Sequence, residues 1–174
     1  MNGENDIGVH FDPHFNFQEH DNKKVQLANR NLGLIAKSFC YMFKETFLTL
    51  YKSIVWSHIG YITPVWSPRF KKEQNIIENV QKKPTRIFGG LCEKPYHERL
   101  NLLGIPSLEY RRHRADMIQT YKIFQRIDKI YKHALFPAPP ITNRTRGNTF
   151  KIHKQHCKTN LRKHSFRQRV VALE

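Results

Sequence analysis

The chain has 174 residues, of which 39% are hydrophobic and 12% aromatic, and its 30 Lys and Arg against 14 Asp and Glu give a formal net charge of +16. This apolar and aromatic content is too high for an intrinsically disordered chain, and the length suits one folded domain with or without a tail. No run approaches the roughly 18 apolar residues of a membrane span, and the acidic amino terminus is unlike a secretory leader. The composition predicts a folded nuclear or cytoplasmic protein that is not secreted and does not bind a membrane.

The basic charge is unevenly distributed. Residues 1–22 contain five acids and no Lys or Arg, so all thirty basic residues lie in the rest of the chain, where nine acids oppose them and leave a balance of +21. Such a stretch attracts polyanions and is typical of proteins that bind phosphate backbones. A solvated cationic surface without a partner is the alternative interpretation.

The first predicted element is a strand at residues 6–11. Ile7, Val9 and Phe11 alternate with small or polar residues, which is the pattern of a half-buried strand, and Asp12-Pro13 provides a turn after it. The sequence that follows shows no partner strand. We therefore expect an isolated strand, or the remnant of a hairpin, at the amino terminus.

Helices are predicted from residue 23 onwards. Proline and serine mark their ends: Pro64 and Pro84 should end two helices, and Ser67 and Ser107 should cap the two that begin beside them. Apolar residues recur at three- and four-residue steps over residues 23–39, 43–62, 68–83, 96–103 and 108–131. In the last helix, which we expect to be the central core helix, the apolar arc consists of Leu108, Ala115, Ile118, Tyr121, Phe124 and Ile127.

The chain changes character at Pro137-Ala138-Pro139-Pro140. Residues 141–173 hold nine Lys or Arg and no acid, with few apolar residues before Val170. The predicted fold is therefore mainly α: a short strand or hairpin remnant at 1–22, a basic helical bundle at 23–136, and a proline-rich linker with a poorly ordered basic tail at 137–174.

No catalytic or metal site is predicted. Transfer of phosphoryl groups by two metal ions needs clustered carboxylates, and the chain contains no Asp-Asp pair. The spacing of His153, His156, Cys157 and His164 follows no zinc pattern, so a solvated tail is favoured over a zinc site. We expect no cofactor and no small-molecule substrate.

The cysteines and the central aromatic residues are interpreted as packing residues. Cys40 and Cys92 lie on or beside apolar helix faces and have no neighbouring His or Asp to activate a thiolate. Aromatic residues at helical spacing more often form a core than stack on bases, and this interpretation is applied to Tyr51, Trp56, Tyr61, Trp66 and Phe70.

The basic helices are the candidate functional feature. Helical Lys and Arg can hold a nucleic-acid backbone without reading its sequence. The candidate binding residues are Lys23, Lys24, Arg30, Lys71, Lys72, Lys82, Lys83, Arg86, Arg111, Arg112 and Arg114.

A series of short motifs in a fixed order carries a family resemblance. The series begins with Asp6-Ile7-Gly8-Val9-x-Phe11-Asp12, Ala28-Asn29-Arg30-Asn31-Leu32-Gly33-Leu34-Ile35 and Leu50-Tyr51-Lys52-Ser53-Ile54-Val55. It continues through Pro64-Val65-Trp66-Ser67-Pro68, Ile77-Glu78-Asn79-Val80-Gln81-Lys82-Lys83, Thr85-Arg86, Tyr96-x-Glu98-Arg99-Leu100, Leu108-Glu109-x-Arg111-Arg112, Tyr121-Lys122-Ile123, Thr145-Arg146-Gly147 and Arg169-Val170-Val171. In this order the motifs resemble the jockey-like, LINE-type reverse transcriptases of non-LTR retrotransposons.

The resemblance implies a fragment of an RNA-directed DNA polymerase. In such elements this stretch follows the catalytic palm, so residues 6–12 look like the edge hairpin near the primer grip, and the helices look like the thumb and its carboxy-terminal extension. The parent enzyme would use Mg²⁺ and copy RNA into DNA. The fragment would keep primer-template binding but no catalytic residue.

Three other hypotheses remain open at this point. The chain could be a host-adopted, non-catalytic DNA- or RNA-binding protein, or a polymerase whose catalytic part another chain supplies. It could also be a structural bundle that binds a protein partner, although the charge argues against this.

Overall fold

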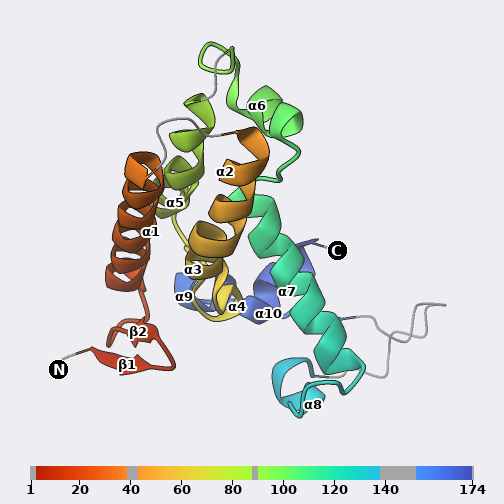
Figure 1. Cartoon of the computed structure of the whole chain (residues 1–174). Coiled ribbons are helices and arrows are strands. Elements are labelled where there is room, and N and C mark those ends of the chain that lie inside the picture. The colour runs from red at the N-terminus through yellow and green to blue at the C-terminus, as the bar shows by residue number, and fades with distance from the viewer. Residues whose placement is uncertain (1–2, 39–42, 88–89, 138–151, 174) are drawn as a thin grey trace. The chain divides into compact units, whose positions relative to one another are not determined.

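The structure is a computed structural model that describes residues 3–38, 43–87, 90–137 and 152–173. The protein is mainly helical, with a two-stranded antiparallel hairpin near its amino terminus, as predicted (Figure 1). The elements are β1 (Glu4–Asp6), β2 (Val9–Phe11), α1 (Gln18–Ser38), α2 (Lys44–Leu50), the π-helical turn η1 (Tyr51–Val55), α3 (Trp56–Gly60), α4 (Thr63–Trp66), α5 (Lys71–Lys82), the 3-10 turn η2 (Pro84–Arg86), α6 (Tyr96–Leu103), α7 (Leu108–Phe124), α8 (Lys132–Leu135), α9 (Asn160–Lys163) and α10 (Phe166–Leu173).

The chain divides into two compact units, Met1–Arg112 and His113–Glu174. The division falls inside α7, so it does not coincide with the three regions expected from the sequence. In the first unit, α1 packs against η1, α3 and α5. Its core is built from buried apolar side chains of every helix from α1 to α6 and includes Ala28, Phe47, Val55, Trp66, Ile77 and Leu100.

The amino-terminal strand has a partner within the chain. β1 pairs with β2, with Asp6 opposite Val9, and Ile7 and Gly8 form the turn with φ angles of 46° and 74°. Positive φ at both turn residues matches the twist of a tight hairpin, and glycine adopts it without strain. Of the two alternatives expected at the amino terminus, the hairpin is therefore present, and the single strand over 6–11 is not. Ile7, expected to face inward, lies in the turn and is 72% exposed.

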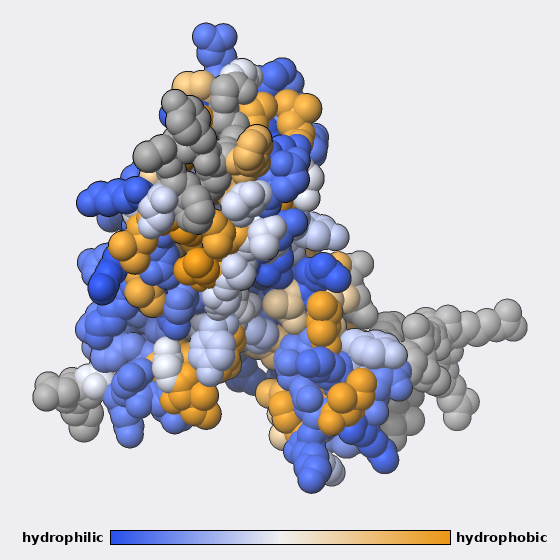
Figure 2. Space-filling view, in the orientation of Figure 1, coloured by the Kyte–Doolittle hydropathy of each residue, from blue (hydrophilic) through white to orange (hydrophobic). Residues whose placement is uncertain are grey.

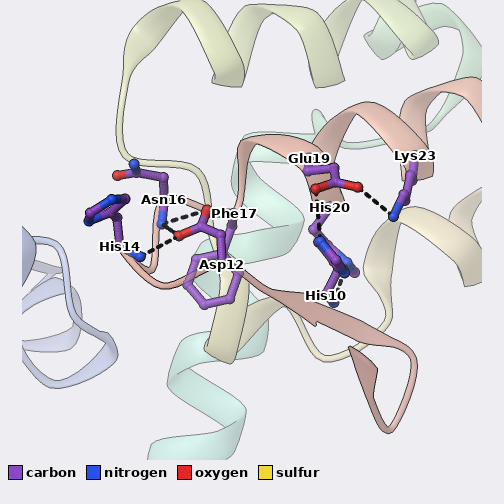
Figure 3. Close-up of polar contacts among 8 residues, drawn as sticks. All are labelled: His10, Asp12, His14, Asn16, Phe17, Glu19, His20 and Lys23. Atoms are coloured by element: carbon purple, nitrogen blue, oxygen red, sulfur yellow. Dashed lines mark hydrogen bonds and ion pairs between the residues drawn. The ribbon is translucent and has the colours of Figure 1, made fainter. Parts of the chain in front are cut away.

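Asp12 organises the loop between β2 and α1. Its carboxylate accepts hydrogen bonds from the backbone N–H groups of His14, Asn16 and Phe17 at 2.9–3.1 Å (Figure 3). These bonds satisfy amides that no strand or helix pairs, which is the usual role of Asp in a turn. Because the loop closes on Asp12, α1 begins at Gln18, five residues before the predicted start.

Two histidines join the hairpin to α1. The backbone N–H of His10 donates to Nδ1 of His20 at 3.1 Å (Figure 3). The His20 ring packs edge-on against Trp66, with 4.9 Å between the ring centroids. His20 is buried, and burial lowers its pKa to about 4, with the nearby charge of Lys24 as the next contribution. The ring is therefore neutral at pH 7, which is the state in which Nδ1 can accept this bond.

The second predicted helix is divided into three helical pieces. Phe47, Tyr51 and Val55 are buried as the apolar pattern predicts, whereas Phe43 is 79% exposed. The helical run stops at Gly60, and Pro64 lies in the first turn of the separate helix α4. Proline fits there because the first amides of a helix have no partner to lose.

The ends of α5 and α6 test the predicted boundaries. α6 has the predicted limits and is followed by Gly104 in the left-handed conformation at φ 67°. α5 ends before Pro84 as predicted, but it begins at Lys71, not at Pro68, because the Glu73 carboxylate accepts the backbone N–H of Phe70 at 3.3 Å.

Gln81 connects four elements of the first unit through one buried amide. Its side chain is fully buried, and its oxygen accepts from Tyr51 Oη at 3.2 Å and from Trp56 Nε1 at 3.0 Å. Its nitrogen donates to Tyr96 Oη at 3.1 Å and to the carbonyl of Pro106 at 2.9 Å. All four hydrogen-bonding positions of the amide are used, so the group is buried without an orphaned atom.

The same network places the start of α7. Tyr96 Oη also donates to the Glu78 carboxylate, and burial together with Glu78 raises the pKa of Tyr96, which keeps the phenol protonated. The Glu78 carboxylate in turn accepts the backbone N–H groups of Leu108 and Glu109 at 3.1 and 3.2 Å. A negative charge at the first amides of a helix is favoured by the helix dipole. Ser107 Oγ, the predicted cap, accepts the N–H of Tyr110 at 3.1 Å.

The apolar arc predicted for the last helix is wrong in its carboxy-terminal half. Ile118, Tyr121 and Ile127 are 44%, 61% and 62% exposed, and α7 ends at Phe124 instead of near residue 131. Besides the predicted Leu108, the helix buries Arg112, Asp116, Thr120 and Ile123, and three of these four are polar or charged. The apolar pattern missed this face because charged side chains occupy it.

An ion pair organises the second unit. Asp116, which is 1% exposed, receives two bonds from the Arg169 guanidinium, at 3.0 and 3.1 Å, and Arg169 Nη1 also donates to the carbonyl of His164. Val170 is buried beside it in α10. The expectation of a poorly ordered tail is therefore corrected for residues 152–173, while residues 138–151 lie outside the described part of the chain.

Replacement of Gln81 by Ala should destabilise the first unit by roughly 2–4 kcal/mol, because it leaves buried donors of Tyr51 and Trp56 without an acceptor and opens a cavity. The measurement is urea unfolding followed by tryptophan fluorescence. The matched control is Gln26→Ala on the exposed side of α1, which should change the free energy of unfolding by less than about 0.5 kcal/mol. Equal effects of the two substitutions would contradict the role given to Gln81.

Replacement of Asp116 by Asn should release α10. The Arg169 guanidinium would lose its charged partner in a site where it is 15% exposed, and breaking a buried pair in this way costs about 3 kcal/mol. Hydrogen exchange should show faster exchange of the amides of residues 166–173. Glu93→Gln, at an exposed carboxylate, serves as the control and should leave these amides protected.

Candidate nucleic-acid interface

The structure places ten of the eleven predicted basic residues at the surface, exposed or half-buried, and buries one. Nine of the ten belong to the first unit, and Arg114 belongs to the second. They fall into separate groups at the two ends of α5, on α1 and on α7, and do not form one continuous stripe along a single helix.

The buried residue is Arg112, which is 5% exposed, and its assignment to the interface is corrected. Arg111, Arg112 and Arg114 lie within one turn of α7, where successive residues differ by about 100° around the axis, so a run of this length must turn one side chain inward. The inward side chain lies near a buried acid, Asp21. Arg112 is a core charge and not a surface contact.

The first surface group lies on α1. Lys23 pairs with Glu19 at 2.7 Å, and the other oxygen of that carboxylate lies 2.8 Å from His10 Nε2 (Figure 3). Lys24 is half-buried with its Nζ 5.3 Å from the centroid of the Tyr61 ring, and this burial lowers its pKa. Arg30 is exposed farther along the helix. The charge of Lys23 is thus partly neutralised, which leaves Lys24 and Arg30 as the stronger candidates of this group.

The second group lies at the amino-terminal end of α5 and borders a cavity. Lys71 and Lys72 are exposed. The cavity, which we name the α1–α5 cavity, has a volume of about 410 Å³ and is lined by Gln18, Asp21, Asn22, Phe70, Lys72, Glu73 and Ile76. It brings residues of the first turns of α1 together with residues around the start of α5.

The third group lies at the carboxy-terminal end of α5, roughly 16 Å from its start at the rise of an α-helix. Lys83 and Arg86 are exposed, and Lys82 Nζ lies 5.4 Å from the centroid of the Tyr96 ring. The neighbouring Arg99 is buried and donates to the carbonyl of Lys82 at 3.3 Å, so it completes the helix end and does not add to the surface charge.

The aromatic residues divide between core and surface. Tyr51, Trp56 and Trp66 are buried, as interpreted from the sequence. Tyr61 and Phe70 are 42% and 54% exposed, so their assignment to the core is wrong. Arg111 covers the Trp56 ring at 3.9 Å from its centroid, which shields that indole from solvent.

Phe70 and its neighbour Arg69 lie at the surface, although Phe70 was expected in the core and Arg69 was not among the predicted binding residues. The Arg69 guanidinium lies 5.4 Å from the Phe70 ring centroid and also donates to the side-chain oxygen of Asn16 in the Asp12 loop. Phe15, in the same loop, is 50% exposed. The signal available in the sequence was the aromatic-basic run Phe70-Lys71-Lys72 directly after Arg69.

The remaining candidate features are metal ligands, membrane-spanning helices, cysteines and surface hydrophobic residues. Within the described ranges there is no group of three or more His, Cys, Asp or Glu that could hold a metal ion, and no helix long and apolar enough to cross a membrane. Cys92 is exposed, which corrects its interpretation as a packing residue, and Cys40 lies outside the described residues. Hydrophobic residues appear in Figure 2 as separate patches among hydrophilic ones on the face that it shows.

Asp21 is a buried residue whose carboxyl group lies in the lining of the α1–α5 cavity. It is 3% exposed, and neither of its oxygens has a hydrogen-bond partner within the described part of the chain. Burial and, after it, the charge of Glu73 raise its pKa to about 8, against the opposing charge of Arg112. At pH 7 Asp21 is therefore mainly protonated.

Comparison with protein-family models, with curated proteins and with solved structures finds no match to this chain. The resemblance of the motif series to reverse transcriptases therefore stays a prediction from the sequence.

Replacement of Asp21 by Asn should make the protein less sensitive to alkali. A carboxyl whose pKa rises from 3.8 in the unfolded chain to about 8 in the folded one lowers stability progressively as pH rises between these values. The free energies of unfolding of wild type and Asp21→Asn should thus be similar near pH 4, and the variant should be more stable by up to a few kcal/mol at pH 9.

Urea unfolding at several pH values measures this difference. Glu93→Gln, at an exposed carboxylate, is the control and should follow the wild-type profile throughout. If the gap between Asp21→Asn and wild type does not widen with pH, Asp21 is not protonated in the folded protein.

Proposed function

We propose that this chain is a non-catalytic nucleic-acid-binding module, a thumb-like fragment of the reverse transcriptase of a non-LTR mobile element. The observation that carries the proposal is that ten predicted basic residues lie on or beside helical elements at the surface, seven of them exposed and three half-buried, in a chain with a net charge of +16. The motif series supports the origin, and the absence of an Asp-Asp pair from the sequence supports a non-catalytic role.

The basic residues at the two ends of α5 are suited to contact phosphates of one duplex. Lys71 and Lys72 are exposed on the first turn of the twelve-residue helix α5, and Lys83 and Arg86 are exposed directly after it, at its carboxy-terminal cap and in the turn η2. Lys82 lies against Tyr96, which restrains its position. Cations fixed on a rigid helix lose less conformational freedom on binding than cations on a flexible loop, so they position a backbone without sequence recognition.

Binding should weaken steeply with salt, because each phosphate contact releases condensed counterions and contributes about 0.9 to the slope of log affinity against log salt. The substitutions Lys82→Gln with Lys83→Gln, and Lys71→Gln with Lys72→Gln, should each reduce that slope by up to about two and weaken binding of an RNA-DNA duplex. Fluorescence anisotropy with a labelled duplex at several salt concentrations gives the measurement.

The matched control is Lys129→Gln with Lys158→Gln, which removes the same charge from two exposed lysines of the second unit. This pair should leave the slope almost unchanged. A wild-type affinity that does not depend on salt would exclude the proposed function, and an equal loss in all three double variants would show that net charge, and not these positions, causes binding.

A further inference from the structure

The α1–α5 cavity combines an aromatic wall with hydrogen-bonding groups. Phe70 and Ile76 provide apolar surface, and the amides of Gln18 and Asn22 can both donate and accept hydrogen bonds. The volume of about 410 Å³ lies within the range of pockets that enclose small organic groups. A flat heteroaromatic ring with polar edges matches both kinds of wall.

Cations lie at this cavity and beside it. The exposed Lys72 lines it, the exposed Lys71 precedes Lys72 on the first turn of α5, and the guanidinium of the half-buried Arg69 lies against the Phe70 ring. A ring that entered while attached to phosphates would therefore meet positive charge close to the cavity. Aromatic rings flanked by cations are the usual means by which proteins bind single strands, because every base has a π-face and every link a phosphate.

The acids of the cavity do not reverse this charge. Burial raises the pKa of Asp21 to about 8, so at pH 7 this group is mainly neutral. The Glu73 carboxylate accepts the backbone N–H of Phe70. Glu73 is thus the one remaining acid among the lining residues, whereas Lys72 belongs to the lining and Arg69 and Lys71 are its neighbours in the chain, so the local balance favours an anionic ligand.

We propose that the α1–α5 cavity receives an unpaired nucleobase of a single-stranded nucleic acid, with the base against Phe70, its polar edge toward Gln18 and Asn22, and the adjoining phosphates at Arg69, Lys71 and Lys72. This inference rests on the proposed function and deepens it: beside the duplex backbone, the chain holds a strand whose bases are free.

The test compares three labelled probes by anisotropy: a single-stranded oligonucleotide, the same strand with abasic positions throughout its centre, and a blunt duplex. Phe70→Ala should weaken binding of the single strand by about five- to a hundredfold, the range for loss of one stacked base. It should leave duplex affinity within about twofold. The abasic strand should bind wild type as weakly as the intact strand binds the variant.

Two variants make the result specific. Phe43→Ala removes a phenylalanine that is 79% exposed, before α2, where the neighbouring Lys44 contacts α6, and it should bind all three probes like wild type. Phe70→Tyr keeps an aromatic ring and should retain single-strand affinity. Phe70 is 54% exposed, so its removal should not prevent folding, and thermal unfolding of each variant checks this.

The outcomes separate the two proposals. If wild type binds none of the probes, the proposed function fails. If wild type binds the duplex but Phe70→Ala and Phe43→Ala bind the single strand equally, or if the abasic strand binds as well as the intact one, the base-binding cavity is excluded and backbone binding stands.

Discussion

The first unit depends on one buried amide. Gln81 lies in the last turn of α5, where an apolar residue would be expected, and its four hydrogen bonds reach η1, α3, α6 and the segment before α7. Apolar contacts between helices tolerate sliding and rotation, whereas four directed bonds to one group fix the relative positions of their partners. The extension through Tyr96 to Glu78 adds the start of α7 to the same set. This network therefore fixes the start of α7 relative to α5 within the first unit.

Some basic residues of this protein stabilise the fold, and others lie at the surface. Arg99, Arg112 and Arg169 belong to the motifs that carry the family resemblance, yet each has a structural role. Arg99 binds the last carbonyl of α5, Arg112 lies near the buried Asp21, and Arg169 anchors α10 through Asp116. Lys71, Lys72 and Lys83 have no such role and are exposed. Arginine is suited to the first task because its planar guanidinium makes several hydrogen bonds at once.

Local signals in the sequence were sufficient for some elements. The limits of α6 follow from Pro95 and Gly104, and the end of α5 follows from Pro84, because proline and glycine act on the backbone beside them. The exposure of most candidate Lys and Arg residues could also be predicted, because isolated charges are costly to bury. The helical fold class required no more than the three- and four-residue periodicity.

Features that depend on distant residues could not be read in this way. Asp116 is buried because Arg169, 53 residues later, supplies its partner, and the buried face of α7 is therefore charged where an apolar stripe was expected. The first strand of the hairpin was missed because Glu4–Asp6 is short, polar and exposed. The cavity beside Phe70 arises where the start of α1 meets the start of α5, 48 or more residues apart in the chain, and no motif marks it.

The burial of the indoles has a practical consequence. The chain contains two tryptophans, Trp56 and Trp66, and both lie in the first unit. Trp56 is 8% exposed, and Trp66 is fully buried. Their emission therefore reports on the surroundings of the first unit, whereas helical circular dichroism records both units together. The two signals coincide on heating if the units melt as one and separate if they do not, so the chain carries its own spectroscopic label for the cooperativity of its two parts.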